Sequence, residues 1–354
     1  MTATCERSAT YQEDGEGEIV IIHRRSRRSV INPLALAFLS ALMAAVVAAV
    51  FVPPAAAQAG SRVRPVVSLS PPQLPESIAI GRRGDLYLSL NPLREILRIA
   101  PDGTRSVFAT IPAGSASLGV RLDASGNAYV AVPGSGVWRV PAGGGTPAEL
   151  AAVPGLPNGL AFGRHGDLYV SESLGGAIYR ITRGGSVAIW AQSPLLAGTT
   201  GPGPCGIAHP SGLPLGANGI AFDARGDLLV ANTTLGTIVR IRVRPGGSAG
   251  KATVLAGPDC RLWGADGVAM DSRGNLYVAA NAERDIVRVT PGGKLRVLAS
   301  FAAGDPLYSP SDIAFGTGRG DRKQIFITNF AKFTGGTGAG VVTMNTGVPG
   351  QPLP

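Results

Sequence analysis

The chain has 354 residues, of which 45% are hydrophobic and only 16% charged, with 50 Gly and 28 Pro. This composition excludes a disordered acidic or basic tail protein and is typical of many short strands joined by tight turns. The formal net charge is +9, but no clustered basic helix or aromatic platform accompanies it, so we expect no nucleic-acid binding.

Residues 1–57 are predicted to be an export signal rather than part of a fold. The basic stretch Arg24–Arg28 precedes the apolar run Leu34–Val52, and Ala55–Ala57 supplies the small residues that signal peptidase needs. Ser26–Ile31 is also similar to a twin-arginine signal. The alternative is an uncleaved membrane anchor, because the 18 residues Ala35–Val52 can just span a bilayer. We therefore expect a periplasmic, cell-wall-associated or secreted protein, which meets a membrane only if the leader stays uncleaved.

From residue 58 onward the sequence repeats itself at intervals of about 40 to 60 residues. Each repeat starts with a short segment that leads into an apolar stretch. The six starts are Pro75–Ala79, Ser117–Val120, Pro157–Ala161, Ala217–Ala221, Ala265–Ala269 and Pro310–Ala314. A turn such as Arg83-Gly84-Asp85 follows most starts, and three further short strands complete the unit. Four short antiparallel strands at this period predict the blade of a β-propeller.

The predicted fold is therefore all-β: a six-bladed β-propeller with four-stranded antiparallel blades over residues 58–354. The sixth repeat lacks an outer strand, because the chain soon ends after Val341–Met344. Pro65–Leu69 is predicted to supply this strand, so that an N-terminal strand closes the last blade and covers its edge.

The innermost strand of every blade runs beside the central channel, so equivalent residues at the six starts should form a ring. These ring residues are Glu76, Leu118, Asn158, Asn218, Asp266 and Ser311. Two carboxylates brought together on an axis repel each other. A hard divalent cation such as calcium, which binds carboxylate and amide oxygens, removes that repulsion. Any single Asn-Gly or Asp-Gly pair is equally typical of a turn. Four oxygen-bearing side chains at equivalent positions, including Glu76, which is no turn former, favour a metal site.

On this pattern the chain resembles the senescence-marker-protein/gluconolactonase (LRE-like) family, and more loosely the strictosidine-synthase-like and NHL-type propellers. The resemblance implies a divalent cation, usually Ca²⁺, held by Glu76, Asn158, Asn218 and Asp266. It also implies hydrolysis of a small-molecule lactone or related ester, with Asp266 as the catalytic base or nucleophile. Leu118 stands where the family tends to carry polar groups, which allows a more apolar substrate than a sugar. We expect a monomer.

Two other functions fit the same sequence. One is a non-enzymatic, exported, NHL-like propeller that binds a ligand or a protein partner, with a purely structural cation. The other is different chemistry on the same scaffold, either phosphotriester cleavage or a condensation like that of strictosidine synthase. The sequence alone does not separate the hydrolase from this second alternative.

Loops between the second and third strands of the blades should open on the same mouth as the ring. They offer Asn91, Glu172, Asn232, Asn281 and Asn329 as substrate contacts, or simply as polar loop residues. His165 is interpreted as an exposed turn residue.

The only long insertion, residues 195–215, carries His209 and Cys205. His209 could overhang the site and share acid–base work there, or it could be a surface loop residue. Cys205 and Cys260 belong to neighbouring loops, and in an exported chain they are predicted to form a disulfide rather than two free thiols.

Overall fold

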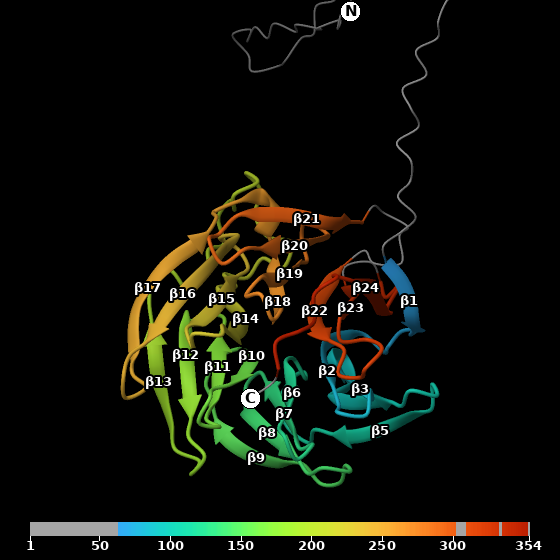
Figure 1. Cartoon of the computed structure of the whole chain (residues 1–354). Coiled ribbons are helices and arrows are strands. Elements are labelled where there is room, and N and C mark those ends of the chain that lie inside the picture. The colour runs from blue at the N-terminus through green and yellow to red at the C-terminus, as the bar shows by residue number, and fades with distance from the viewer. Residues whose placement is uncertain (1–62, 302–308, 333–334, 353–354) are drawn as a thin grey trace, which may run out of the picture. The chain divides into compact units, whose positions relative to one another are not determined.

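A computed structural model of the chain describes residues 63–301, 309–332 and 335–352, and it confirms a six-bladed β-propeller of four-stranded antiparallel sheets (Figure 1). The compact unit spans Gln58–Pro354. The predicted leader lies outside the described residues. Within the described part of the chain, no helix has the length and apolar character to cross a membrane.

The strands of the first three blades follow one another in sequence from the channel outward. Blade one contains β2 (Pro75–Ile80), β3 (Leu86–Leu90), β4 (Glu95–Ile99) and β5 (Arg105–Thr110), with the short 3-10 helix η1 (Asn91–Leu93) between β3 and β4. Blade two contains β6 (Val120–Leu122), β7 (Ala128–Val132), β8 (Gly136–Val140) and β9 (Ala148–Ala152). Blade three contains β10 (Pro157–Phe162), β11 (Leu168–Glu172), β12 (Ala177–Ile181) and β13 (Val187–Gln192).

Blades four and five repeat this order. Blade four contains β14 (Ala217–Phe222), β15 (Leu228–Asn232), β16 (Thr237–Val243) and β17 (Ala249–Ala256). Blade five contains β18 (Ala265–Met270), β19 (Leu276–Ala280), β20 (Asp285–Val289) and β21 (Leu295–Ser300), and the 3-10 helix η2 (Cys260–Leu262) precedes it.

Blade six combines segments from the two ends of the described chain. It contains β22 (Pro310–Phe315), β23 (Gln324–Asn329) and β24 (Gly340–Asn345), and its outer strand is β1 (Val63–Ser68). In Figure 1, β1 lies beside β24, with Val63 opposite Met344 and Ser68 opposite Gly340. This pairing leaves the outer edge of β24 covered.

Aromatic pairs recur where one blade packs on the next. Tyr129 of β7 meets Phe162 of β10 edge to face, with ring centroids 5.1 Å apart. Tyr169 meets Phe222 at 4.9 Å, and Tyr277 meets Phe315 at 5.4 Å, in the same T-shaped arrangement. Edge-to-face aromatic pairs contribute about 0.5–1.5 kcal/mol each beyond the area they bury. Because the pairs come from second and first strands of adjacent blades, they hold neighbouring blades, and hence the ring residues, at fixed spacing.

Candidate metal centre on the propeller axis

Five of the six ring residues line the axial cavity, and each of these five stands where the innermost strand is bulged. The sixth, Leu118, packs in the hydrophobic core instead. In five blades the ladder between the first and second strands shifts register at this point, for example between Pro157 and Leu160 and between Ala217 and Ile220. A bulge re-aims a side chain that regular pairing would keep on the face of the sheet. Hydroxyl groups on second strands satisfy backbone groups that the bulges leave unpaired. Gly159 N donates to Ser171 Oγ at 2.8 Å, and Asp312 N donates to Thr328 Oγ1 at 2.9 Å.

Glycines next to the ring let adjacent blades approach closely. A Cβ on Gly119 would stand 2.1 Å from the Asn158 carbonyl oxygen, and one on Gly219 would stand 2.2 Å from the Asp266 carbonyl oxygen. Gly159 and Gly267 are equally crowded by the following blade. The Asn-Gly and Asp-Gly pairs therefore lie within strands at the neck of the channel, and the interpretation as turns is wrong for them.

The ring encloses a small polar cavity on the axis. Its volume is about 10 Å³, which is roughly room for one water-sized particle. Glu76, Asn158, Asn218 and Asp266 all line it, as do Ser311, Asp312 and Arg121. Three carboxylates and one guanidinium give these side chains a net charge of −2 when all are ionised. A divalent cation is the natural complement of such a cavity.

Glu76 is a buried ring carboxylate with an unsatisfied oxygen. Its side chain is buried, and Oε2 has no hydrogen-bond partner among the described residues. Burial, followed by the charges of Asp266 and Asp312, raises the pKa of Glu76 well above its ordinary value, and Arg121 and Lys332 offset part of that effect. A buried carboxylate oxygen without a donor is an unsatisfied acceptor, and a cation in the cavity would satisfy it.

Asn218 and Asp266 form one unit on the opposite part of the ring. Asn218 Nδ2 donates to Thr233 Oγ1 at 3.1 Å, and Thr233 Oγ1 donates to the carbonyl oxygen of Ala265 at 2.9 Å. Burial, and then the charge of Asp312, raises the pKa of Asp266 well above its ordinary value, whereas a hydrogen bond with the Asn218 side chain lowers it. An amide that donates through its nitrogen can offer its carbonyl oxygen to a hard cation.

A buried ion pair between Arg121 and Asp312 lies at the side of the same cavity. Arg121 Nη1 donates to Asp312 Oδ2 at 3.0 Å and to the carbonyl oxygens of Val120 and Ile78 at 2.8 and 3.2 Å. Asp312 Oδ2 also accepts from Ser77 Oγ at 2.5 Å. The pair thus joins blades one, two and six. Asp312 therefore both lines the channel and bonds across the blade interface.

Sequence reasoning missed Arg121, although the repeat contains a signal for it. The residue three positions after the ring residue is alanine in five blades and Arg121 in blade two. The alanines are Ala79, Ala161, Ala221, Ala269 and Ala314. Five blades keep this position small, and blade two carries an arginine. This contrast indicates that the Arg121 side chain extends into the space beside the channel.

Three of the loop residues offered as substrate contacts bind backbone instead. Glu172 accepts from the amides of Leu156, Leu174 and Gly175 at 2.9, 3.0 and 2.6 Å. Asn232 donates to the Leu195 and Ala197 carbonyl oxygens and accepts from Leu235 N.

Asn329, at the end of β23, accepts from Ser309 N at 2.8 Å and donates to the Gly338 carbonyl oxygen. Residues that end the second strand thus fasten the loop leading into their own blade. Asn91 begins η1, and Asn281 is buried just after β19. Their role as substrate contacts stays a prediction.

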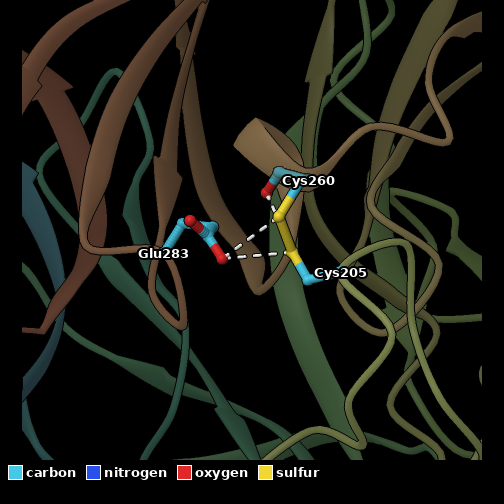
Figure 2. Close-up of side chains that lie close together, drawn as sticks. All are labelled: Cys205, Cys260 and Glu283. Atoms are coloured by element: carbon cyan, nitrogen blue, oxygen red, sulfur yellow. Dashed lines mark hydrogen bonds between the residues drawn. A yellow bond between two sulfur atoms is a disulfide. The ribbon is translucent and has the colours of Figure 1, made fainter. Parts of the chain in front are cut away.

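The insertion is tied to the loop leading into blade five. Cys205 and Cys260 form a disulfide, with Cα atoms 5.0 Å apart (Figure 2). Glu283 points at this bond, and its Oε1 lies 3.1 Å from Cys205 Sγ and 3.4 Å from Cys260 Sγ. Burial, and then the charge of Asp285, raises the pKa of Glu283. With both sulfurs engaged in the disulfide, these three side chains do not form a metal site.

His209 is buried, so the interpretation as a surface loop residue is wrong. Only 7% of it is exposed, and its ring meets Trp263 edge to face at 5.9 Å. Nδ1 pairs with Ser211 Oγ at 2.8 Å, while Nε2 is buried without a hydrogen-bond partner in the described ranges. Burial lowers the pKa of His209. His209 therefore anchors the insertion against Trp263, three residues before Asp266. His165 lies in the β10–β11 turn and is exposed, as expected.

Fold and site together define a six-bladed β-propeller with an acid–amide ring around its axis. The model of the SMP-30/Gluconolactonase/LRE-like region matches residues 213–331, a segment that contains Asn218 and Asp266. The chain thus resembles this family over that segment. A comparison with curated protein sequences gave no match.

Solved structures share the architecture at low sequence identity. A gluconolactonase from Xanthomonas campestris is 18% identical with a TM-score of 0.59, covering 82% of this chain and 89% of its own. Regucalcin from Agrobacterium tumefaciens, a calcium-binding protein, is also 18% identical with a TM-score of 0.59, covering 80% and 93%. Virginiamycin B lyase from Staphylococcus aureus is 17% identical with a TM-score of 0.54, covering 75% and 81%. At this level of identity the likeness concerns the fold.

Proposed function

We propose that this chain is a divalent-cation-dependent hydrolase of lactones or related esters, with Ca²⁺ bound by Glu76, Asn158, Asn218 and Asp266. The observation that carries the proposal is the buried, unpartnered Oε2 of Glu76 in a cavity that it shares with two amides and Asp266. The family match across residues 213–331 and the named activities of the gluconolactonase and regucalcin neighbours support it.

The donor set fits a hard cation. Two carboxylates and two amide oxygens are ligands that calcium accepts in flexible geometry, with coordination positions left for water and substrate. No Cys or His lines the cavity, which disfavours softer metals such as zinc. When bound, the cation would supply Lewis-acid polarisation of a substrate carbonyl.

Asp266 is the residue we assign to proton transfer. It is partly exposed whereas Glu76 is buried, so water and substrate reach it more readily. Burial raises the pKa of Asp266, which makes its carboxylate a stronger base than an exposed aspartate. In hydrolysis Asp266 would take a proton from the attacking water and return it to the departing alkoxide, so that one lactone and one water give one hydroxy acid.

The mouth above the ring favours a substrate with an apolar part. Leu174, Ile207 and Leu213 expose 41%, 57% and 45% of their surface. Leu174 belongs to the loop after β11 and the other two to the insertion, and Gly216 N joins these segments by donating to the Ser173 carbonyl oxygen at 2.8 Å. We infer that alkyl-substituted lactones or esters are better substrates than polyhydroxylated sugar lactones.

We further propose that the protein is exported. The Cys205–Cys260 disulfide supports this, because disulfides persist in oxidising compartments and are rare in the cytosol.

The test is calorimetric titration of calcium into the compact unit Gln58–Pro354, beside Asp266→Ala and Asn218→Ala. We expect saturable one-to-one binding that both variants lose. Asp102→Ala, which removes a carboxylate from an exposed turn, is the matched control and should bind as the wild type does. A panel of alkyl lactones, aryl esters and sugar lactones, each with and without chelator, then tests the activity.

The outcomes separate the parts of the proposal. Binding that is lost in the two variants, together with chelator-sensitive hydrolysis, supports the whole. Binding without hydrolysis of any substrate would leave a structural cation in a ligand-binding propeller. Absence of calcium binding by the wild type would overturn the proposed site.

A further inference from the structure

The third strands of the blades carry an arginine at one equivalent position, away from the metal centre. The five arginines are Arg98, Arg139, Arg180, Arg240 and Arg288. In blades one and three this side chain has a carboxylate partner. Arg98 Nε donates to Asp85 Oδ1 at 2.9 Å, and Arg180 Nε donates to Asp167 Oδ2 at 2.7 Å. The aspartates come from the hairpin turn between the first and second strands.

Blades two and five depart from this pattern, because Asn127 and Asn275 replace the turn aspartate. Asn275 Nδ2 donates to Asp271 Oδ2 at 2.8 Å, and the same oxygen accepts from the Tyr277 hydroxyl at 3.2 Å. Asp271 is therefore occupied by its own turn. Nε of Arg288 is buried, and the part of the chain that the structure describes gives it no hydrogen-bond partner. The same holds for Nε of Arg240 in blade four, so what sets blade five apart is the residue opposite its arginine.

A second arginine lies directly across the sheet from Arg288. Arg296 of β21 is its register partner. In the other four blades the residue opposite the arginine is uncharged: Ser106, Ala148, Ala188 and Thr253. Like charges directly opposite in an antiparallel pair are destabilising, and an anion between them would reverse the sign of this interaction.

The two arginines line a pocket of about 300 Å³ at the seam between blades five and six. We call it the seam pocket. Its other lining residues are Tyr277, Leu298, Met344, Asn345 and Thr346, so no carboxylate of the described residues contributes to its wall. The volume is at the lower end of the range for small-molecule sites.

We propose that the seam pocket binds the oxyanion group of a small ligand, a carboxylate or a phosphate, between the guanidinium groups of Arg288 and Arg296. Guanidinium groups suit this role because their fixed fork of donors matches the oxygens of either group. The apolar side chains of Leu298 and Met344 would contact the remainder of the ligand.

The test is calorimetric titration of the protein with inorganic phosphate and, separately, with succinate, in 150 mM NaCl to screen non-specific attraction. We expect saturable one-to-one binding of at least one probe. The better probe distinguishes phosphate from carboxylate recognition. Arg288→Gln and Arg296→Gln should each weaken binding by roughly tenfold or more, the loss expected for a charge-assisted hydrogen bond.

Arg139→Gln is the matched control, because it removes the same charge at the same register position where Ala148 stands opposite. It should leave binding within about twofold of wild type. Equal affinity in the Arg139 and Arg288 variants, or no saturable binding of either probe, would overturn the proposal.

A charge reversal gives a second readout that does not need a ligand. Arg296→Glu places a carboxylate opposite Arg288, so the melting temperature without anions should rise while probe binding disappears. A lower melting temperature in this variant would show that the two arginines do not repel each other, and would contradict the proposal as well.

Discussion

Gly267 lies directly against Asp312 of the next blade: a Cβ on Gly267 would stand 2.1 Å from Asp312 Oδ1 and 2.4 Å from its Cα. Asp312 cannot retreat, because its carboxylate is held by Arg121, Ser77 and two backbone amides. The residue next to the ring aspartate is thus glycine because of the neighbouring blade.

Gly267→Ala should therefore lower the free energy of unfolding by about 3 kcal/mol, at the upper end of what overpacking usually costs. Denaturant unfolding measures the change. Gly292→Ala is the control, since nothing lies within 4 Å of its added methyl group. Similar stability in the two variants would mean that the backbone around Gly267 and Asp312 can move apart at little cost in free energy.

The Arg121–Asp312 pair should contribute much more to the free energy of folding than the ion pair between Arg98 and Asp85. The Arg121 and Asp312 side chains are 20% and 6% exposed, against 42% for Arg98. Arg121→Met removes the guanidinium from a buried carboxylate that keeps only its hydrogen bonds to Ser77 and two backbone amides, and it should cost about 3 kcal/mol. Arg98→Met should cost about 1 kcal/mol or less. A double-mutant cycle with Asp312→Asn should recover much of the loss. Additive effects would contradict a direct coupling.

The metal-free protein should be more stable in mild acid than at neutral pH. Burial and neighbouring carboxylates raise the pKa of Glu76, so the folded state keeps a proton that the unfolded chain releases above a pKa of roughly 4.3. Stability is therefore lost as pH rises through this window toward the folded-state pKa. Glu76→Gln removes one of the two buried carboxyls whose pKa is raised, Asp266 being the other, so in the presence of chelator it should raise the melting temperature at pH 7.5 and reduce the difference from pH 5. An unchanged pH profile would mean that Glu76 does not carry this effect.

The disulfide should be complete in the purified compact unit, so a thiol assay on the unfolded, unreduced protein should detect no free thiol. Replacing Cys205 and Cys260 together by serine should lower stability by up to about 4 kcal/mol, because the bond closes a loop with a sequence separation of 55. Two reactive thiols in the unreduced protein would contradict the pairing.

Asn232 and Asn158 should behave oppositely, although both are buried amides. The Asn232 side chain forms its hydrogen bonds with backbone groups, so Asn232→Ala should lower the free energy of unfolding by about 2–3 kcal/mol. The folded fraction of this variant should bind calcium normally. Asn158 lines the axial cavity, and Asn158→Ala should weaken calcium binding with a smaller loss of stability. Loss of calcium binding in both variants would place Asn232 in the site.

Much of the fold could be predicted because every blade needs the same kinds of residue at its strand starts and turns, so the sequence repeats with the blades. Five of the predicted starts coincide with β2, β10, β14, β18 and β22. The start in blade two differs, because β6 begins only at Val120 and Leu118–Gly119 precede it. The ring residues of the other five blades could be aligned for the same reason, because each stands at a bulge that recurs in those blades.

The side-chain contacts could not be predicted. Arg121 meets Asp312 across 191 residues of sequence, and no local pattern reports such a pairing. The second-strand amides and Glu172 look like substrate contacts, because a polar residue at a loop suits either role. Only the direction of their hydrogen bonds, toward backbone, separates the roles.

The disulfide has a further consequence, because its two cysteines stand on either side of a whole blade. All four strands of blade four, from Ala217 to Ala256, lie between Cys205 and Cys260. A protease that cut once inside this blade would leave the two fragments covalently joined, with the cut strands still held by their neighbours. Such a nicked molecule should run as one chain on a denaturing gel until it is reduced, whereas a single cut outside residues 205–260 should give two separate fragments on the same gel.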